Sequence, residues 1–239
     1  MKEQIIIFLR EYLAGKKAII GLSGGIDSTV VAYLLAEAIG SNNILGLILP
    51  SNISKKSDVK DALNVCNELK IDSKIINIQS IIDEYKKTTP IAKKKNVSAN
   101  LQPRIRMSLL YAYAASYGGL VVGTGNKSEL LTGYFTKHGD GGVDLLPIGN
   151  LYKTQVFELA SQIGVSEKII IKKPSAGLLP GQSDEKELGL TYTELDDILM
   201  SMESKKPLVG FNPQHIQRVM ELYSNAQHKL TLPPIPKVL

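Results

Sequence analysis

The sequence has little of what marks secreted and membrane proteins. Cys66 is the single cysteine among 239 residues, so no disulfide can form within the chain and a reducing compartment is favoured. The apolar run near its start, residues 5–9, is too short for a signal peptide or a membrane span. We therefore expect a cytoplasmic protein that has no membrane partner.

Several common catalytic signatures are also missing. The chain has no G-x-x-x-x-G-K-[ST] phosphate loop and no G-x-G-x-x-G fingerprint. Their absence argues against Walker-type nucleotidases and against Rossmann or flavodoxin-like oxidoreductases. No Ser–His–Asp pattern, internal repeat or low-complexity tract is found.

The composition is that of a globular protein. Hydrophobic residues make up 44% of the chain and charged residues 21%, enough to bury a sizeable core in a single domain over residues 1–239. The formal net charge of +5 suits a phosphate-rich ligand, but it is too small to argue for a nucleic-acid partner.

Apolar runs alternate with helical patterns through the first two-thirds of the chain. Strands are predicted at residues 17–22, 44–49, 75–78 and 120–123, and helices at 28–39, 57–70 and 100–117. This rhythm predicts an α/β fold with a doubly wound parallel sheet covered by helices on both faces.

The last third has a different pattern. Helices are predicted at residues 153–163, 191–201 and 213–225, and Pro233, Pro234 and Pro236 indicate an extended tail. Residues 172–188 are rich in proline, glycine, serine and charge. A stretch of this length without regular structure is either a functional lid or disordered.

The strongest local signal is Ser23-Gly24-Gly25-Ile26-Asp27-Ser28, which joins the first predicted strand to a helix. Its glycines let backbone N–H groups approach an anion, and the helix N-terminus adds unpaired donors and partial positive charge. We predict a pyrophosphate cradle, in which Mg²⁺ would join Asp27 to the phosphates. The alternative is a tight turn with Asp27 or Ser28 as N-cap.

This hexapeptide resembles the SGGxDS signature of the N-type ATP pyrophosphatases, which cleave ATP to AMP and pyrophosphate and adenylate a substrate oxygen. Three further stretches resemble NAD synthetases within that superfamily. They are N-L-Q-P-R-I-R-M at residues 100–107; G-T-G-N-K-S-E at 123–129, continuing through T-G-Y-F-T-K-H-G-D-G-G at 132–142 to D-L-L-P at 144–147; and K-P-S-A-G-L at 173–178 with G-Q-S-D-E at 181–185. Together they cover most of residues 20–190.

The resemblance implies a Rossmann-like fold of the adenine nucleotide alpha hydrolase type and ATP-dependent amidation of deamido-NAD by ammonia. An NAD-adenylate would form first, and AMP and pyrophosphate would be released. By resemblance, ATP is bound by Gly21, Leu22, Ser23, Gly24, Gly25, Ile26, Asp27, Ser28, Thr124, Lys153 and Ser175. Deamido-NAD is bound by Arg104, Lys137, Asp144, His228 and Lys229, and Mg²⁺ by Asp27 and Glu129.

The residues themselves support several of these roles. Arg104 and Arg106 lie two positions apart on a predicted helix and point to different faces, so one can bind a ligand anion while the other pairs internally or stays solvated. Asp27 and Glu129 each follow a predicted strand, and ligands of open α/β sheets bind at that edge. The alternative for Glu129 is an exposed residue at a helix start.

Two residues are expected to act on the reacting groups. Lys153 opens a predicted helix, where its charge opposes the helix dipole; this misfit and the resemblance favour a phosphate contact over a solvated lysine. Asp140 lies in a glycine-rich loop and, by resemblance, near the reacting end, where it would orient ammonia or take its proton. His138, in the same loop, is expected to be a surface histidine.

The chain departs from the commoner family pattern in two places. Leu101-Gln102-Pro103 replaces a more helical stretch, and Pro103 is expected in the first turn of its helix. Gly125-Asn126 replaces an aspartate-containing version of the loop after the fourth predicted strand.

The donor, the assembly and two rival functions complete the expectations. Glutamine-using relatives carry an extra amidotransferase domain, for which this chain leaves no room, so free ammonia is expected, with a separate glutaminase left open. The resemblance implies a homodimer.

Two rival functions are considered. One rival is another adenylating enzyme, such as a tRNA-thiolating one. The other rival is a module that senses adenine nucleotides without turnover. Asp27, Glu129 and Lys153 argue against this rival, because binding alone needs fewer charged groups.

Overall fold

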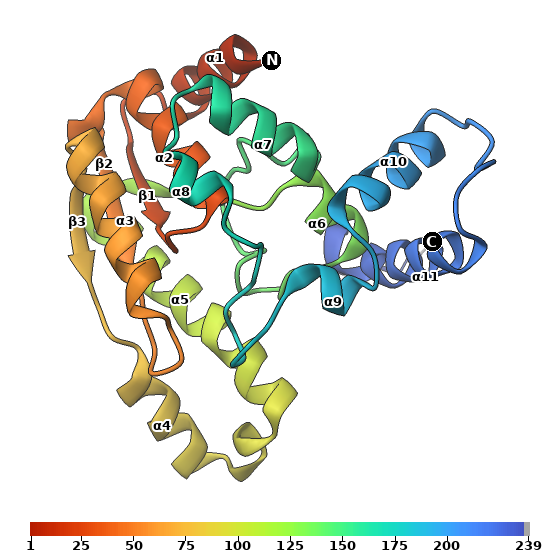
Figure 1. Ribbon diagram of the computed structural model, residues 1–239. Helices are drawn as coiled ribbons and strands as arrows, with labels where there is room; N and C mark the ends of the chain where they lie inside the picture. The colour runs from red at the N-terminus through yellow and green to blue at the C-terminus, as the bar shows by residue number, and fades with distance from the viewer. Residues whose placement is uncertain (237–239) are drawn as a thin grey trace.

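The computed structural model describes residues 1–236 (Figure 1). Its sheet consists of β1 (Lys17–Gly21), β2 (Ile44–Ile48), β3 (Asp72–Ile75) and β4 (Gly119–Val122), in the order β3-β2-β1-β4. All neighbouring strands pair in parallel. The predicted parallel α/β sheet is therefore confirmed.

Helices cover both faces of the sheet. One face packs against α1 (Lys2–Leu13), α2 (Ile26–Ile39), α3 (Lys56–Leu69), α7 (Lys153–Gln162) and α8 (Glu167–Ile170). The other packs against α4 (Gln79–Thr88) and α5 (Lys95–Tyr117), and two short 3₁₀ helices lie at η1 (Ser41–Asn43) and η2 (Pro90–Lys93).

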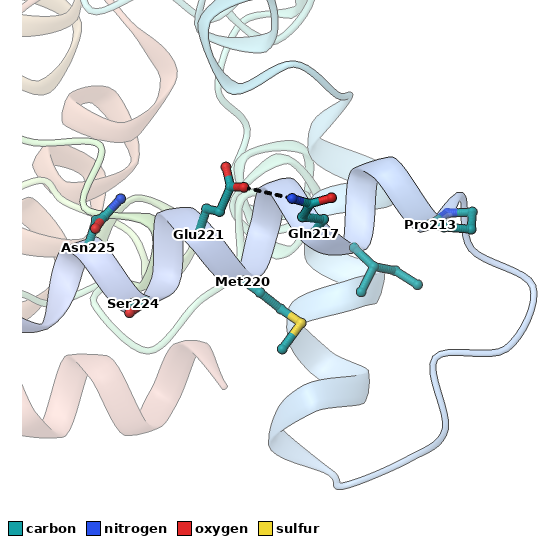
Figure 2. Close-up of a pocket in the computed structure, with 7 residues that line it drawn as sticks. Pro213, Gln217, Met220, Glu221, Ser224 and Asn225 are labelled. Carbon is teal, nitrogen blue, oxygen red and sulfur yellow. Dashed lines mark hydrogen bonds between the residues drawn. The ribbon is translucent and has the colours of Figure 1, made fainter.

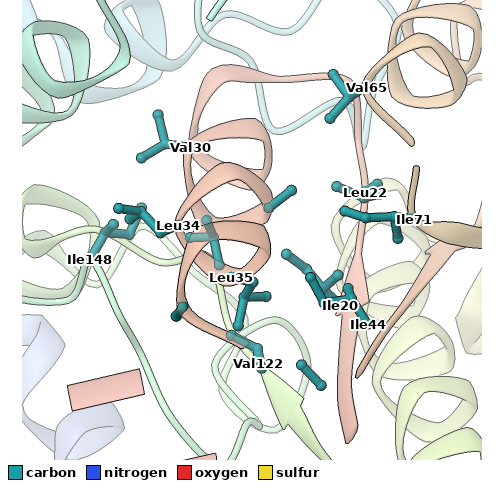
Figure 3. Packing of buried hydrophobic residues seen from close by; sticks show 14 of the residues in the cluster. Ile20, Leu22, Val30, Leu34, Leu35, Ile44, Val65, Ile71, Val122 and Ile148 are labelled. Carbon is teal, nitrogen blue, oxygen red and sulfur yellow. The ribbon is translucent and has the colours of Figure 1, made fainter. Parts of the chain in front are cut away.

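The alternation of side chains along β1 divides the core in two. Ala18 and Ile20 join the cluster around α2, whereas Ile19 joins the cluster beneath α5. Figure 3 shows Ile20 in the first cluster beside Leu35 and Val122. Because both faces of the strand are buried, its sequence is a continuous apolar run rather than an alternating one. This is the reason that the central strands can be predicted from the sequence.

The C-terminal helices form a separate apolar cluster. Helices α6 (Lys127–Thr132), α9 (Asp184–Leu188), α10 (Tyr192–Glu203) and α11 (Pro213–Leu230) bury Leu188, Leu195, Ile198, Leu199 and Val219 among others. Figure 1 shows α10 and α11 on the side of the molecule away from β3. These are the extra C-terminal helices that the sequence predicts, and residues 232–236 after them form neither helix nor strand.

Two sequence predictions are wrong in their bounds. The third strand is β3 (Asp72–Ile75) rather than residues 75–78. It lies at the sheet edge and is mostly exposed, so no apolar run marks it; the apolar Ile78 that follows is buried against the α4–α5 side. Helix α5 begins at Lys95, so Pro103 lies inside it rather than in its first turn. Burial of Pro103 against Gly139 offsets the backbone hydrogen bond that proline removes.

Helix α1 was not predicted as an element. It buries Ile6, Leu9 and Leu13 against the sheet cluster and ends at Ala14, which has a left-handed backbone. Between Met1 and Pro236, none of the helices has both the length and the apolar character that a bilayer crossing needs.

The strand order creates a switch point between β1 and β4. From β1 the chain proceeds outward to β2 and β3, and then returns to place β4 on the opposite side of β1. The loops that leave the carboxyl ends of β1 and β4 therefore diverge, and such a switch point is where open α/β sheets bind ligands.

Candidate active site

The loop after β1 is held by its own serines. The Ser23 and Ser28 hydroxyl oxygens lie 3.1 Å apart, and the Gly25 N–H donates to Ser23 Oγ at 3.2 Å. Helix α2 has Gly25 at its N-cap and no side-chain cap, so the alternative in which Asp27 or Ser28 caps the helix is wrong. The free helix start keeps its backbone donors for an anion.

Gly24 is the position in this loop that requires glycine. Its φ is +76°, and a Cβ there would meet the backbone oxygen of Asp58 at 2.1 Å. The loop thus lies directly against the first turns of α3. Gly21 and Leu22, which are also predicted to contact ATP, precede this loop, and the Leu22 N–H extends the strand pairing by donating to Leu47 O at 2.9 Å.

Asp27 meets the loop after β4 through Asn126. Asn126 Nδ2 donates to Asp27 Oδ1 at 3.0 Å, and the Asn126 N–H donates to Glu129 Oε2 at 3.1 Å. Glu129 N–H in turn donates to Asn126 Oδ1 at 3.0 Å, which completes a capping box at the start of α6. Glu129 is therefore a helix-start residue, as the alternative held. It is half-buried rather than exposed, however, and it lies near the charge of Asp27.

Lys153 closes this cluster from the first turn of α7. Its Nζ forms an ion pair with Asp27 Oδ2, and its side chain is only 2% exposed. Burial opposes the lysine charge, but the attraction of Asp27 and Glu129 outweighs it and raises the pKa of Lys153. The attraction of the two carboxylates therefore offsets the unfavourable position of this charge at a helix start.

The two carboxylates fit a divalent cation. Burial, and then repulsion from Asp27, raises the pKa of Glu129 to about 8. A hard cation would relieve this repulsion, and Mg²⁺ is commonly held by one or two carboxylates with phosphate and water oxygens. In the part of the chain that the structure describes, no group of three or more His, Cys, Asp or Glu side chains could hold a metal by itself. Asp27 and Glu129 would need oxygens from a ligand.

A buried aspartate that the sequence did not reveal anchors Lys153. Asp196 in α10 is fully buried and accepts hydrogen bonds from Ser128 Oγ, from Thr154 N–H at 2.8 Å and from Thr154 Oγ1 at 2.9 Å. Ser128 Oγ itself accepts the Lys153 N–H at 2.9 Å. Asp196 thus fixes the starts of α6 and α7, which carry Glu129 and Lys153.

Asp184 is a second residue without a predicted role. It is 4% exposed, and its carboxylate accepts from Tyr134 Oη at 3.0 Å, Tyr192 Oη at 3.2 Å and the Ala176 N–H at 2.9 Å. Burial raises its pKa, opposed first by the charge of Lys153. The sequence marked this residue only through the G-Q-S-D-E stretch.

Four of the five predicted deamido-NAD residues, all except Asp144, come together from three segments. Arg104 Nη2 donates to Lys137 O at 3.3 Å, and Lys137 Nζ donates to His228 O. Lys229 Nζ donates to Gly133 O at 2.6 Å and Phe135 O at 2.8 Å. A helix at the far end of the sequence therefore completes this region, although the short His-Lys pair gave almost no local signal.

Arg106 and Asp140 face each other across the glycine-rich loop. Arg106 Nε donates to Leu49 O at 3.0 Å just beyond β2, and burial lowers the pKa of Arg106 to about 10 against the attraction of Asp140. Asp140 Oδ1 accepts the Thr136 N–H at 2.9 Å, and desolvation raises the pKa of Asp140. His138 is exposed, as expected.

Asp144 and Thr124 lie on the β4 side. Asp144 Oδ2 accepts the Val121 N–H at 2.7 Å, and its Oδ1 accepts from Tyr111 Oη at 3.1 Å. Both carboxylate oxygens thus hold β4 against α5. Thr124 is half-buried in the loop between β4 and α6.

The segment of residues 172–188 is ordered by contacts with the site rather than being irregular throughout. It ends in α9, and Ser175 Oγ donates to Gln182 O at 2.8 Å within the segment. Buried Gln102 donates from Nε2 to Leu178 O at 3.1 Å and accepts from Ser51 Oγ at 3.0 Å. Sequence reasoning missed Gln102 because its role depends on two distant segments.

A separate hollow lies along α11 (Figure 2). It is an open depression of about 550 Å³ beside residues such as Ile216, Met220 and Asn225, and Gln217 Nε2 donates to Glu221 Oε1 there at 3.1 Å. None of its lining residues belongs to the predicted site, so this hollow is not the candidate active site.

Known proteins resemble the chain over its whole length. A model of the NAD synthase family matches residues 1–233. The chain is 46% identical to an NH(3)-dependent NAD(+) synthetase of Archaeoglobus fulgidus, covering 99% of this chain and 96% of that protein. It is 45% identical to the protein of the same name in Pyrococcus furiosus, with 99% and 95% covered.

Solved structures agree with this match. An NMN synthetase from Francisella tularensis superposes with a TM-score of 0.89 and 37% identity, covering 100% of this chain and 99% of that chain. An NH3-dependent NAD synthetase from Campylobacter jejuni superposes with a TM-score of 0.85 and 35% identity, covering 99% of this chain and 97% of that chain. The predicted resemblance is confirmed: the family model and the relatives that match along the chain show that the protein belongs to the NAD synthase family.

Proposed function

We propose that the chain amidates deamido-NAD to NAD with ammonia, at the cost of ATP cleavage to AMP and pyrophosphate. The observation that carries this proposal is the cluster of Asp27, Asn126, Glu129 and Lys153 beside an uncapped helix start at the switch point. The Archaeoglobus fulgidus, Pyrococcus furiosus and Campylobacter jejuni proteins named above carry the activity in their names.

The first step is adenylation. A carboxylate oxygen of the nicotinate ring attacks the α-phosphorus of ATP, and the bond from that phosphorus to the pyrophosphate oxygen breaks. The backbone N–H groups of residues 23–28 and the ammonium of Lys153 neutralise charge on the phosphates. When bound, Mg²⁺ at Asp27 and Glu129 supplies further charge neutralisation. Thr124 and Ser175 contribute hydroxyl contacts to ATP.

The second step transfers ammonia. Its nitrogen attacks the activated carbonyl carbon, AMP leaves with the ester oxygen, and one proton is lost to give the neutral amide. Arg104, Lys137, Asp144, His228 and Lys229 hold deamido-NAD in this scheme. Asp140 faces the cations Arg106 and Lys229 and is assigned the role of orienting ammonia and accepting its proton.

The variant Asp140→Asn tests the role of Asp140. Asparagine keeps the shape and its oxygen can still accept the Thr136 N–H, so the loop should fold. NAD formation should fall about 100-fold, the usual contribution of a general base, while the dissociation constant for ATP stays unchanged. Turnover at the wild-type rate would remove the role. Asp83→Asn, on the surface of α4, serves as the control.

Residues 172–188 act as a lid that keeps water from the adenylate. The contact between Gln102 and Leu178 tethers this lid to α5. In Gln102→Leu, loss of a hydrogen bond of about 1 kcal/mol should raise the open population about fivefold. The AMP formed per NAD should rise accordingly. Gln217→Leu loses only a surface bond to Glu221 and should stay near one AMP per NAD; the same ratio in both variants would contradict the lid.

The chain functions as a homodimer in this proposal. Helix α5 buries only Ala99, Gln102, Pro103, Ile105 and Ala114 along its 23 residues. The stacked rings of Tyr113 and Tyr117 lie 6.1 Å apart on its second half, and Tyr117 is 42% exposed. An apolar face of this kind is suited to a partner. Light scattering should give twice the chain mass of 26.1 kDa; a monomer would contradict the dimer.

The decisive experiment is reconstitution with purified protein. Deamido-NAD, ATP, Mg²⁺ and ammonium are combined, each is omitted in turn, and NAD and AMP are quantified. One NAD per AMP in the complete mixture alone is the expected result. Activity without Mg²⁺ would remove the metal from the scheme, and the absence of NAD in the complete mixture would refute the function.

A second candidate uses the mononucleotide. The solved Francisella tularensis structure with a TM-score of 0.89 is named an NMN synthetase. The same amidation on the deamido form of NMN would need no second nucleotide in the site. The ratio of kcat/KM for the dinucleotide and the mononucleotide discriminates the two, and we expect it to favour the dinucleotide.

A further inference from the structure

Lys172 joins the lid to the phosphate loop. It lies at the start of residues 172–188, and its Nζ donates to Gly24 O at 2.9 Å, Asp58 Oδ1 at 3.0 Å and Asp61 Oδ2 at 2.7 Å. Its side chain is 28% exposed. A single ammonium thus connects three segments that are far apart in the sequence.

The two carboxylates of α3 hold this ammonium firmly. Asp61 is 2% exposed and also pairs with Lys168 in α8. Burial opposes the charge of Lys172, but its hydrogen bonds to Asp61 and Asp58 outweigh burial and raise the pKa of Lys172. Since the loop also lies against the backbone of Asp58 at Gly24, its position depends on α3 through two contacts.

The contact with Gly24 O has a direct consequence for the cradle. Gly24 O and the Gly25 N–H belong to the same planar trans peptide and point in opposite directions. When Lys172 fixes the oxygen, the N–H is directed away from Lys172, and it donates to Ser23 Oγ at 3.2 Å. The same serine oxygen lies 3.1 Å from Ser28 Oγ. The orientation of one peptide therefore determines where two of the predicted phosphate donors lie.

We propose that Lys172 is a positioning residue for ATP: it fixes the Gly24–Gly25 peptide, whose N–H holds the Ser23 hydroxyl oxygen in the phosphate loop, and it couples this orientation to the start of the lid. The inference rests on the proposed function only in that the loop binds ATP. Without the ammonium, the Gly24 oxygen and the Asp58 carboxylate would place uncompensated negative charge beside the phosphates.

The test measures ATP affinity separately from NAD formation. Lys172→Met should weaken ATP–Mg²⁺ binding by calorimetry and raise the KM for ATP about tenfold, as expected for loss of a charge-assisted hydrogen bond. The KM for deamido-NAD should stay within about twofold. Lys172→Arg keeps the charge and should restore most of the ATP affinity. Lys172→Gln replaces the methionine variant if that chain does not fold.

Lys168→Met is the matched control. Lys168 also pairs with Asp61 but has no contact with Gly24, so the KM for ATP should stay at the wild-type value. Equal changes in both KM values of Lys172→Met, or an unchanged ATP affinity, would overturn the inference while wild-type NAD formation stands. Wild-type protein that binds no ATP would overturn the proposed function itself.

Discussion

Lys153→Met is expected to lower NAD formation about 1000-fold, the upper range for loss of one preorganised charged contact to a transition state. The ammonium is buried and paired with Asp27 at the switch point, so little solvent screens its charge. With ATP bound, a phosphate oxygen would become its partner. Methionine has similar length and no charge, so the substitution removes the attraction and keeps most of the packing.

Single-turnover measurement of adenylate and pyrophosphate formation would locate this effect in the first step. Lys127→Met is the control, because Lys127 also opens a helix but pairs at 2.7 Å with the half-exposed Glu203. That control should retain turnover within about twofold, since exposed pairs contribute little. Lys153→Met with more than a tenth of wild-type turnover would exclude the proposed role.

The pairing of Lys153 also shows what sequence reasoning reached and what it did not. The position of this lysine at a helix start was readable, and its charge against the dipole marked it as unusual. The partner Asp27 lies in the phosphate loop, and nothing in the sequence between them indicates that the two side chains meet. Local patterns report residues that are close in sequence, whereas this pair forms only through the packing of α2 against α7.

For the fold, too, local patterns predict some elements, and contacts between distant segments determine the others. The buried strands β1 and β2 carry apolar runs and were predicted almost to the residue, whereas the exposed edge strand β3 was shifted. Pro103 predicted a helix start, but tertiary burial keeps it inside α5. Gln102, Asp184 and Asp196 are buried polar residues whose partners come from distant segments. Their types alone indicate a surface position, so only the structure reveals them.

Asp196→Ala is expected to cost about 3 to 5 kcal/mol of unfolding free energy, as when one partner of a buried charged network is removed. The carboxylate accepts bonds from Ser128 and twice from Thr154, and the buried donors would lose their partners. Urea denaturation measures this loss directly. Asp197→Ala removes the exposed neighbour in the same helix and should change the unfolding free energy by less than about 0.5 kcal/mol.

Asp196→Asn separates stability from activity. The amide oxygen can still accept from Thr154, but the amide nitrogen now faces Ser128, whose hydroxyl proton loses its acceptor. The unfolding free energy should therefore fall by only about 1 to 2 kcal/mol, which leaves the protein folded at 25 °C. Because Ser128, which accepts the Lys153 N–H, is then held less firmly, the KM for ATP should rise while the KM for deamido-NAD holds. An equal rise in the two KM values would mean that Asp196 only supports the fold and does not position Lys153.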